Sequence, residues 1–159
     1  MITGKPAPLF FRNDYAQRLK KLFEPSIVSY LPLDEPGGSV AFDYSGKGRN
    51  GAYTAVTLGQ NGIGDGRSAA SFNGTSSLCN WHSAALAAAF NGAEGTLMAW
   101  AKVSSAGVWT DNAHRTIARV AVDTSNYIQL YKYTNNAFLF DYFAGGVAEQ
   151  ISLCRRKAL

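Results

Sequence analysis

The stretch that decides the fold runs from Tyr30 to Gly51 and reads YLPLDEPGGSVAFDYSGKGRNG. An extended run ends in the acidic pair Asp34 and Glu35, and a Gly-Gly turn follows. Asp43 then begins a second turn-forming segment. A short extended run followed by turn-forming residues occurs again in Ala69-Ala-Ser-Phe-Asn-Gly-Thr-Ser-Ser77. Short extended runs between glycine-rich turns are typical of an all-β chain.

The composition predicts one globular domain. The chain has 159 residues, of which 47% are hydrophobic and 16% charged, enough for a core and too apolar for disorder. No run approaches the roughly 20 apolar residues that span a bilayer. Pro6, Pro8 and Arg12 interrupt the N-terminal region, which therefore does not predict a signal peptide.

The chain has two cysteines, Cys79 and Cys154, which are too few for a disulfide framework. We expect two free thiols rather than one disulfide bridge.

The positive charge is concentrated at the two ends of the chain. Residues 24–154 carry seven basic and ten acidic side chains, so the body is mildly acidic although the formal net charge is +4. A basic surface that would follow a phosphate backbone is not visible in this body. The sequence therefore argues against a nucleic-acid partner.

Two short helices are predicted. Asn13 or Asp14 can begin a helix that runs to Phe23, with its apolar residues near one face. This amphipathic helix either packs on its own domain or docks the domain on a larger assembly. Ser83 can begin a second helix over the alanine-rich residues 83–90.

The remaining elements are predicted strands. They include residues 27–31, residues 51–58, and a hairpin of 69–72 and 77–81 joined by the turn Asn73-Gly74. Residues 96–103 read as a central strand buried on both faces, with Trp81 and Trp100 in the core. A meander of 115–122, 127–133 and 137–143 follows, with turns at 123–126 and 134–136.

Four ordered segments between residues 28 and 147 together resemble a laminin G-like domain of the concanavalin A-like superfamily. They are Tyr30–Glu35, Asp43–Gly46 with Asn50-Gly51, Ala70–Gly74, and the strand from Gly95 to Val103. The resemblance implies an antiparallel β-sandwich of jelly-roll type that binds sugars or proteins. The expected organisation is an arm and helix over residues 1–25 and the sandwich over 26–159.

The chain departs from the resemblance after residue 146. Relatives continue with further strands, one carrying a Trp and a His, and the residues after 146 predict that these closing strands are lacking here. The sandwich is therefore expected to be incomplete at its C-terminal end, with an open sheet edge. Either the product is truncated, or a partner chain or a second copy completes the sheet.

The resemblance also implies a structural calcium ion, because many relatives hold one near such turns. The oxygen donors in the matching motifs are Asp34, Glu35, Asp43 and Asn73, of which Asp34, Asp43 and Asn73 are the predicted calcium ligands. The alternative for Asp43 is that its carboxylate closes its own turn through Ser45 and Gly46. No cofactor is required by the sequence.

Carbohydrate binding needs exposed aromatic rings beside hydroxyl-binding polar groups. Tyr127, Gln129, Tyr131 and Tyr133 alternate along one strand and share a face, whereas Trp109 lies in a loop with Asp111 and Asn112. These seven residues are the candidate ligand-binding residues. The alternative is that the tyrosines simply cover the outer sheet surface.

The sequence does not favour an enzyme. The Glu-x-Asp-x-x-Glu run of related glucanases is absent, and the adjacent Asp34 and Glu35 point to opposite faces of a strand. The sequence therefore predicts a non-catalytic, lectin-like binding module. The alternative is a structural or adhesion module of a phage virion or a bacterial surface assembly, without a small-molecule ligand.

Overall fold

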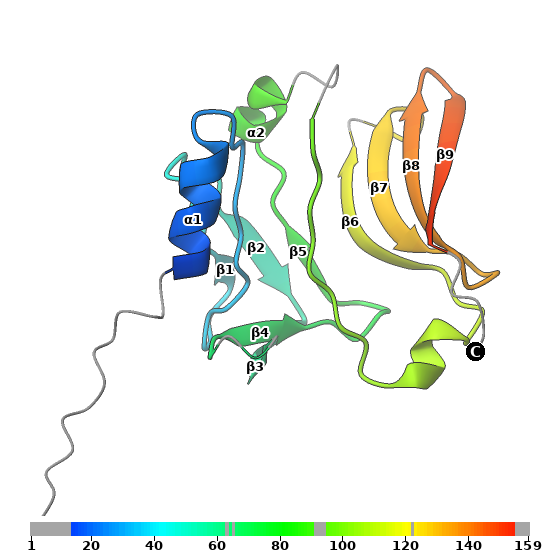
Figure 1. The fold of residues 1–159 in the computed structure, drawn as a ribbon, viewed down its shortest axis with the longest axis horizontal. Coiled ribbons are helices and arrows are strands. Elements are labelled where there is room, and N and C mark those ends of the chain that lie inside the picture. Colours follow the sequence, from blue (N-terminus) through cyan, green and yellow to red (C-terminus); the bar gives the residue numbers. More distant parts are fainter. Residues whose placement is uncertain (1–13, 63, 65, 91–94, 122, 155–159) are drawn as a thin grey trace, which may run out of the picture. The chain divides into compact units, whose positions relative to one another are not determined.

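The computed structural model describes residues 14–62, 64, 66–90, 95–121 and 123–154, so the predicted arm over 1–12 lies outside the described part. The chain forms two compact units, residues 1–93 and 94–159 (Figure 1). The described residues contain three antiparallel sheets and two short α-helices, joined by turns and irregular segments. The predicted all-β, β-sandwich class with two short helices is confirmed.

The first unit contains two small antiparallel sheets. Strands β1 (Val40–Ala41), β2 (Gly51–Thr54) and β5 (Leu78–Asn80) form one sheet in the order β1-β2-β5, and β3 (Thr57–Asn61) pairs with β4 (Ser68–Ser71). Helix α1 (Asp14–Phe23) begins and ends as predicted. Helix α2 (Ala84–Ala89) also forms as predicted, and its N-cap residue Ser83 accepts a hydrogen bond from Leu86 N.

Three predicted strands of this unit are wrong in detail. Residues 27–31 join no sheet. The run 51–58 is divided between β2 and β3, because Ala55 adopts a left-handed conformation with φ of 51°. The predicted hairpin at Asn73-Gly74 does not form, because β4 pairs with β3 and β5 pairs with β2.

The carboxylate of Asp43 stabilises the turn between β1 and β2. Its Oδ1 accepts hydrogen bonds from the backbone N–H groups of Tyr30 and Ser45, each at 2.9 Å. Its Oδ2 accepts the Ser45 hydroxyl at 2.7 Å and Arg49 N at 2.9 Å. One carboxylate therefore closes its own turn and also holds residue 30, which is why the segment 27–31 contacts this turn rather than a sheet.

A buried carboxylate organises the neighbouring sheet. Glu35 accepts a 2.8 Å hydrogen bond from Phe42 N and a 2.7 Å hydrogen bond from the hydroxyl of Tyr53 on β2. Cys79 of β5 is a free, half-buried thiol. Burial, and after it the charge of Glu35, raise the pKa of this thiol to about 11.

The second unit is a four-stranded antiparallel meander, whose strands lie side by side in yellow to red in Figure 1. A 3-10 helix, η2 (Ala106–Trp109), precedes strands β6 (Arg115–Ala121), β7 (Tyr127–Lys132), β8 (Phe138–Ala144) and β9 (Val147–Cys154). The three predicted strands of the meander are confirmed. Strand β9 was not predicted, and it pairs with β8 from Phe138 to Ala144.

The prediction for residues 96–103 is wrong. This segment joins no sheet, and Trp100, expected in the core, is 70% exposed. Trp81, also expected in the core, is half-buried. Apolar residues at consecutive positions predicted burial on both faces, but that pattern does not specify which strand would pair with the segment.

Within the described part of the chain, none of the helices has the length and apolar character needed to cross a membrane.

Candidate functional site

One end of the meander gathers several of the predicted ligand-binding residues. Arg115, the first residue of β6, lies opposite Lys132, the last residue of β7, and Phe138 at the start of β8 lies on the other side of Lys132. The loop before β6 and the turn after β7 therefore meet at the same end of the sheet. We call Trp109, Asp111, Asn112, Arg115, Lys132 and Asn136 the end-loop site.

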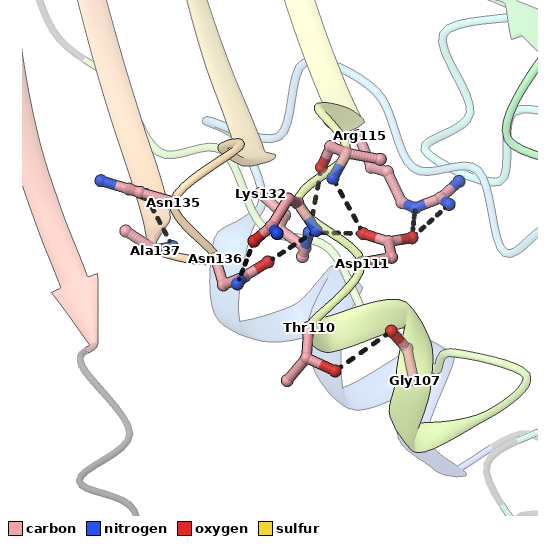
Figure 2. Close-up of polar contacts among 10 residues, drawn as sticks. Gly107, Thr110, Asp111, Arg115, Lys132, Asn135, Asn136 and Ala137 are labelled. Atoms are coloured by element: carbon pink, nitrogen blue, oxygen red, sulfur yellow. Dashed lines mark hydrogen bonds and ion pairs between the residues drawn. The ribbon is translucent and has the colours of Figure 1, made fainter.

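Asp111 is the centre of this site (Figure 2). Its Oδ1 accepts hydrogen bonds from Lys132 Nζ at 2.7 Å and from Ala113 N at 3.0 Å. Its Oδ2 accepts both Nε, at 3.0 Å, and Nη2 of Arg115. Lys132 Nζ also donates to the carbonyl oxygen of Ala113 at 3.0 Å. The loop is thereby fastened to the first two strands of the meander.

The electrostatics of the site follow from these contacts. The Lys132 ammonium, and after it the Arg115 guanidinium and the Ala113 N–H, hold the pKa of Asp111 well below its usual range. Lys132 is 2% exposed, and Asp111 is its partner for charge neutralisation. Asp111 therefore stays ionised at any ordinary pH, and its role is to hold two cations in place.

Two asparagines join the loop before β6 to the turn after β7 by hydrogen bonds. Asn112 N donates to Asn136 Oδ1 at 3.1 Å, and Asn136 Nδ2 donates back to Asn112 Oδ1 at 2.7 Å. Both residues adopt left-handed backbone conformations, with φ of 52° and 64°. Asparagine tolerates this conformation better than most residues do, which is why it can occupy both positions.

Aromatic rings lie on both sides of this end of the sheet. Trp109, which is 38% exposed, packs edge-on against Phe138 with ring centroids 6.4 Å apart. Phe138 is a cross-strand neighbour of Lys132, so Trp109 lies on the Lys132 side. Tyr133 packs against His114 and Tyr131, on the side of the sheet to which Tyr131 points.

The predicted tyrosine row does not form an exposed binding surface. The ring of Tyr127 stacks on Phe143 at 5.0 Å, and the Arg119 guanidinium lies 4.2 Å from its centroid. Because β8 and β6 flank β7, these two neighbours approach Tyr127 from opposite sides. A sugar therefore cannot stack on Tyr127.

The next two residues of the row are buried. Gln129 donates to Asp141 at 3.2 Å, and Tyr131 is 3% exposed under the ring of His114. Of the row, only Tyr133 has substantial exposure, at 44%. We therefore assign the candidate ligand-binding site to the loops at the end of β7 rather than to the face of the strand itself.

The three predicted calcium ligands lie in separate networks. Asp34 pairs with Arg67, Asp43 receives the four hydrogen bonds of its turn, and Asn73 Oδ1 accepts the backbone N–H groups of residues 75–77. Calcium requires six to eight oxygen ligands, and these oxygens already face hydrogen-bond donors. The described residues contain no group of three or more His, Cys, Asp or Glu arranged to hold a metal. The calcium site stays a prediction, and the donor set described here does not fit it.

The sequence predicted part of the end-loop site. Trp109, Asp111 and Asn112 were singled out, whereas Arg115, Lys132 and Asn136 were not. The meander itself contained the missing signal, because consecutive antiparallel strands bring the loop before the first strand to the turn after the second.

The fold and the site define an all-β chain of antiparallel sheets with a polar cluster at one end of a meander. No family model and no curated protein matches the chain. A crystal structure of an S-layer domain-containing protein from Clostridium thermocellum is similar to it, with a TM-score of 0.59 and 16% sequence identity. The similarity covers 82% of this chain and 58% of the other, so this chain spans little more than half of that structure.

Proposed function

We propose that this chain is a non-catalytic binding module of a surface assembly and that it binds carbohydrate at the end-loop site. The observation that supports the proposal most is that the partly exposed Trp109 packs on Phe138, the cross-strand neighbour of Lys132, whose ammonium binds Asp111. An exposed indole offers an apolar face for a sugar ring, and N–H donors of the same site can bind the oxygens of that sugar.

The rigidity of the site also supports binding. The Asn112–Asn136 pair and the bonds of Asp111 hold the two loops before any ligand arrives. A site ordered in advance loses less conformational entropy on binding. The similarity to an S-layer domain-containing protein is consistent with a role at a cell surface, and the laminin G-like motifs are consistent with a glycan ligand.

The test is a glycan-array screen of the purified chain, followed by calorimetry with the best ligand. Trp109→Ala should weaken binding about fivefold or more, because the loss of a stacking ring costs about 1 kcal/mol or more. Trp100→Ala is the matched control, since this tryptophan is also exposed and lies outside the end-loop site. Loss of binding in both variants, or in neither, would place the ligand elsewhere.

A structural or adhesion module without a small-molecule ligand is the second candidate. Helix α1 supports it, because Leu22 and Phe23 of this amphipathic helix remain exposed. In this case deletion of residues 1–25 should abolish assembly with the partner while glycan binding stays intact. A deletion that changes neither property would contradict the docking role of α1.

A further inference from the structure

We propose that the ligand of the end-loop site is an acidic saccharide, one that carries carboxylate groups; this inference rests on the proposed carbohydrate-binding function. The inference rests on two observations. Hydrogen bonds within the site already occupy most of its carboxylate acceptors, and they leave several N–H donors available to a ligand.

The acceptor capacity of Asp111 is already filled. A carboxylate offers about four lone-pair positions. The four donors are Lys132 Nζ, Ala113 N, and Nε and Nη2 of Arg115. Asp111 is therefore unsuited to accept hydroxyl groups from a neutral sugar, although an exposed carboxylate beside an indole first suggests that role.

The amide oxygens of three asparagines are each engaged in one hydrogen bond. Asn136 Oδ1 accepts Asn112 N, Asn112 Oδ1 accepts Asn136 Nδ2, and Asn135 Oδ1 accepts Ala137 N at 2.9 Å. All three amide oxygens are used within the loops (Figure 2). The hydrogen bonds found among the described residues do not use the amide nitrogen of Asn112, so this member of the site keeps its two N–H donors.

Arg115 provides the charge. Its Nε and Nη2 both bind one oxygen of Asp111, and these bonds leave Nη1 unused. The side chain is 33% exposed. Residues 104–115 and 132–138 contain two cations, Arg115 and Lys132, and one carboxylate, Asp111. This end of the sheet therefore has an excess positive charge in a body that is otherwise mildly acidic.

A surface that offers N–H donors, a guanidinium edge and an indole face complements a sugar with anionic oxygens. A guanidinium forms strong, charge-assisted hydrogen bonds with a carboxylate. A uronic acid supplies both that carboxylate and a pyranose ring for Trp109. A neutral sugar could use the indole and the N–H donors, but it would lack the charge-assisted bond to Arg115.

The experiment compares each acidic oligosaccharide with its own methyl ester. Calorimetry is carried out with the full chain on tetragalacturonate and on tetramannuronate, each beside the fully methyl-esterified tetramer. The ester keeps the sugar and removes the charge. We expect at least one acid to bind ten or more times tighter than its ester, and the difference to shrink at high salt.

Variants locate the effect. Arg115→Gln should weaken binding of the acid at least tenfold and leave the affinity for the ester within about twofold. Arg119→Gln is the matched control, because it makes the same change of charge on the same strand, at the residue that contacts Tyr127. It should leave both affinities within about twofold.

The outcomes separate this inference from the proposed function. If the acids and the esters bind equally and Trp109→Ala weakens both, the carbohydrate site stands and the acidic specificity is overturned. If Arg115→Gln and Arg119→Gln weaken binding equally, general charge attraction replaces the site and the inference is overturned. If no saccharide of the array or of these pairs binds, both the proposed function and this inference fail.

Discussion

The hydroxyl of Tyr53 donates a 2.7 Å hydrogen bond to Oε2 of Glu35, whose other oxygen accepts the backbone N–H of Phe42. Glu35 is 6% exposed, so its carboxylate depends on these donors for the hydrogen bonds that water would otherwise supply. The segment around Glu35 joins no sheet. This single side chain therefore fastens that segment to residue 42, just after β1, and to β2.

Replacing Glu35 should be costly. Glu35→Ala leaves the Tyr53 hydroxyl and the Phe42 N–H without their acceptor, and we expect it to lower the free energy of unfolding by about 2–4 kcal/mol. Tyr53→Phe removes one of the two hydrogen bonds and should lower it by about 1–2 kcal/mol. Urea denaturation followed by fluorescence measures both changes. In the double variant the two losses should fall short of additivity, and strict additivity would mean that the two side chains do not interact.

Cys79 should react slowly below pH 9. Burial and the nearby Glu35 raise its pKa from 9.0 to about 11, so the reactive thiolate appears only at higher pH. Iodoacetamide alkylation of a Cys154→Ser variant should show a midpoint near pH 11 in the folded chain and near pH 9 in urea. Because the folded pKa is the higher one, this thiol stabilises the fold fully below pH 9 and loses that contribution as the pH rises through 11.

The control for Cys79 is Glu35→Gln, which removes the negative charge and keeps an acceptor oxygen. It should lower the midpoint of alkylation, because charge repulsion is the second cause of the shift. A folded midpoint already near pH 9 in the parent chain would contradict the environment described for the thiol.

The sequence predicted the meander well because three independent signals agree there. Apolar and polar residues alternate, β-branched and aromatic residues are frequent, and Asp, Asn and Ser occupy the turns. The Asn73-Gly74 hairpin failed because the Asn73 side chain accepts three backbone N–H groups and builds a wider turn. Local turn chemistry indicates that the chain bends, but it does not determine which strands pair afterwards.

The candidate site was only partly predictable for a related reason. Aromatic residues on one face of β7 suggested a sugar platform, and the alternation itself is present. The contacts that exclude the platform come from Arg119 on β6 and from Phe143 on β8, which are distant in sequence. A row of tyrosines has the same pattern whether its rings are exposed or covered by neighbouring strands.

Asp43 should make stability depend on acid pH. Burial opposes ionisation, but the hydrogen bonds from Tyr30, Ser45 and Arg49 outweigh it and lower the pKa below its usual value of 3.8. A group with a depressed folded pKa stabilises the fold above the unfolded value, so this contribution should be lost as the pH falls below 3.8. Chemical denaturation between pH 6 and 2.5 measures the loss, which should be smaller in Asp43→Asn.

The same residue can be tested at neutral pH. Asp43→Ala removes the acceptor of four hydrogen bonds and should lower the free energy of unfolding by about 2 kcal/mol or more, because bonds to a charged group contribute most. Asp123→Ala is the control, since its hydrogen bonds stay within residues 123–126 of one turn. Equal effects of the two variants would contradict the role of Asp43 in holding residue 30.

The ion pair of Lys132 and Asp111 should respond unequally to the loss of either partner. Lys132→Met keeps a long side chain in a buried position and leaves Asp111 paired with Arg115. Asp111→Ala instead leaves a buried ammonium without its counter-ion, which is the costlier state. We therefore expect the urea midpoint to fall further in Asp111→Ala than in Lys132→Met. The reverse order would mean that Lys132 keeps its charge solvated without Asp111, and the end-loop site would then not depend on this pair for its geometry.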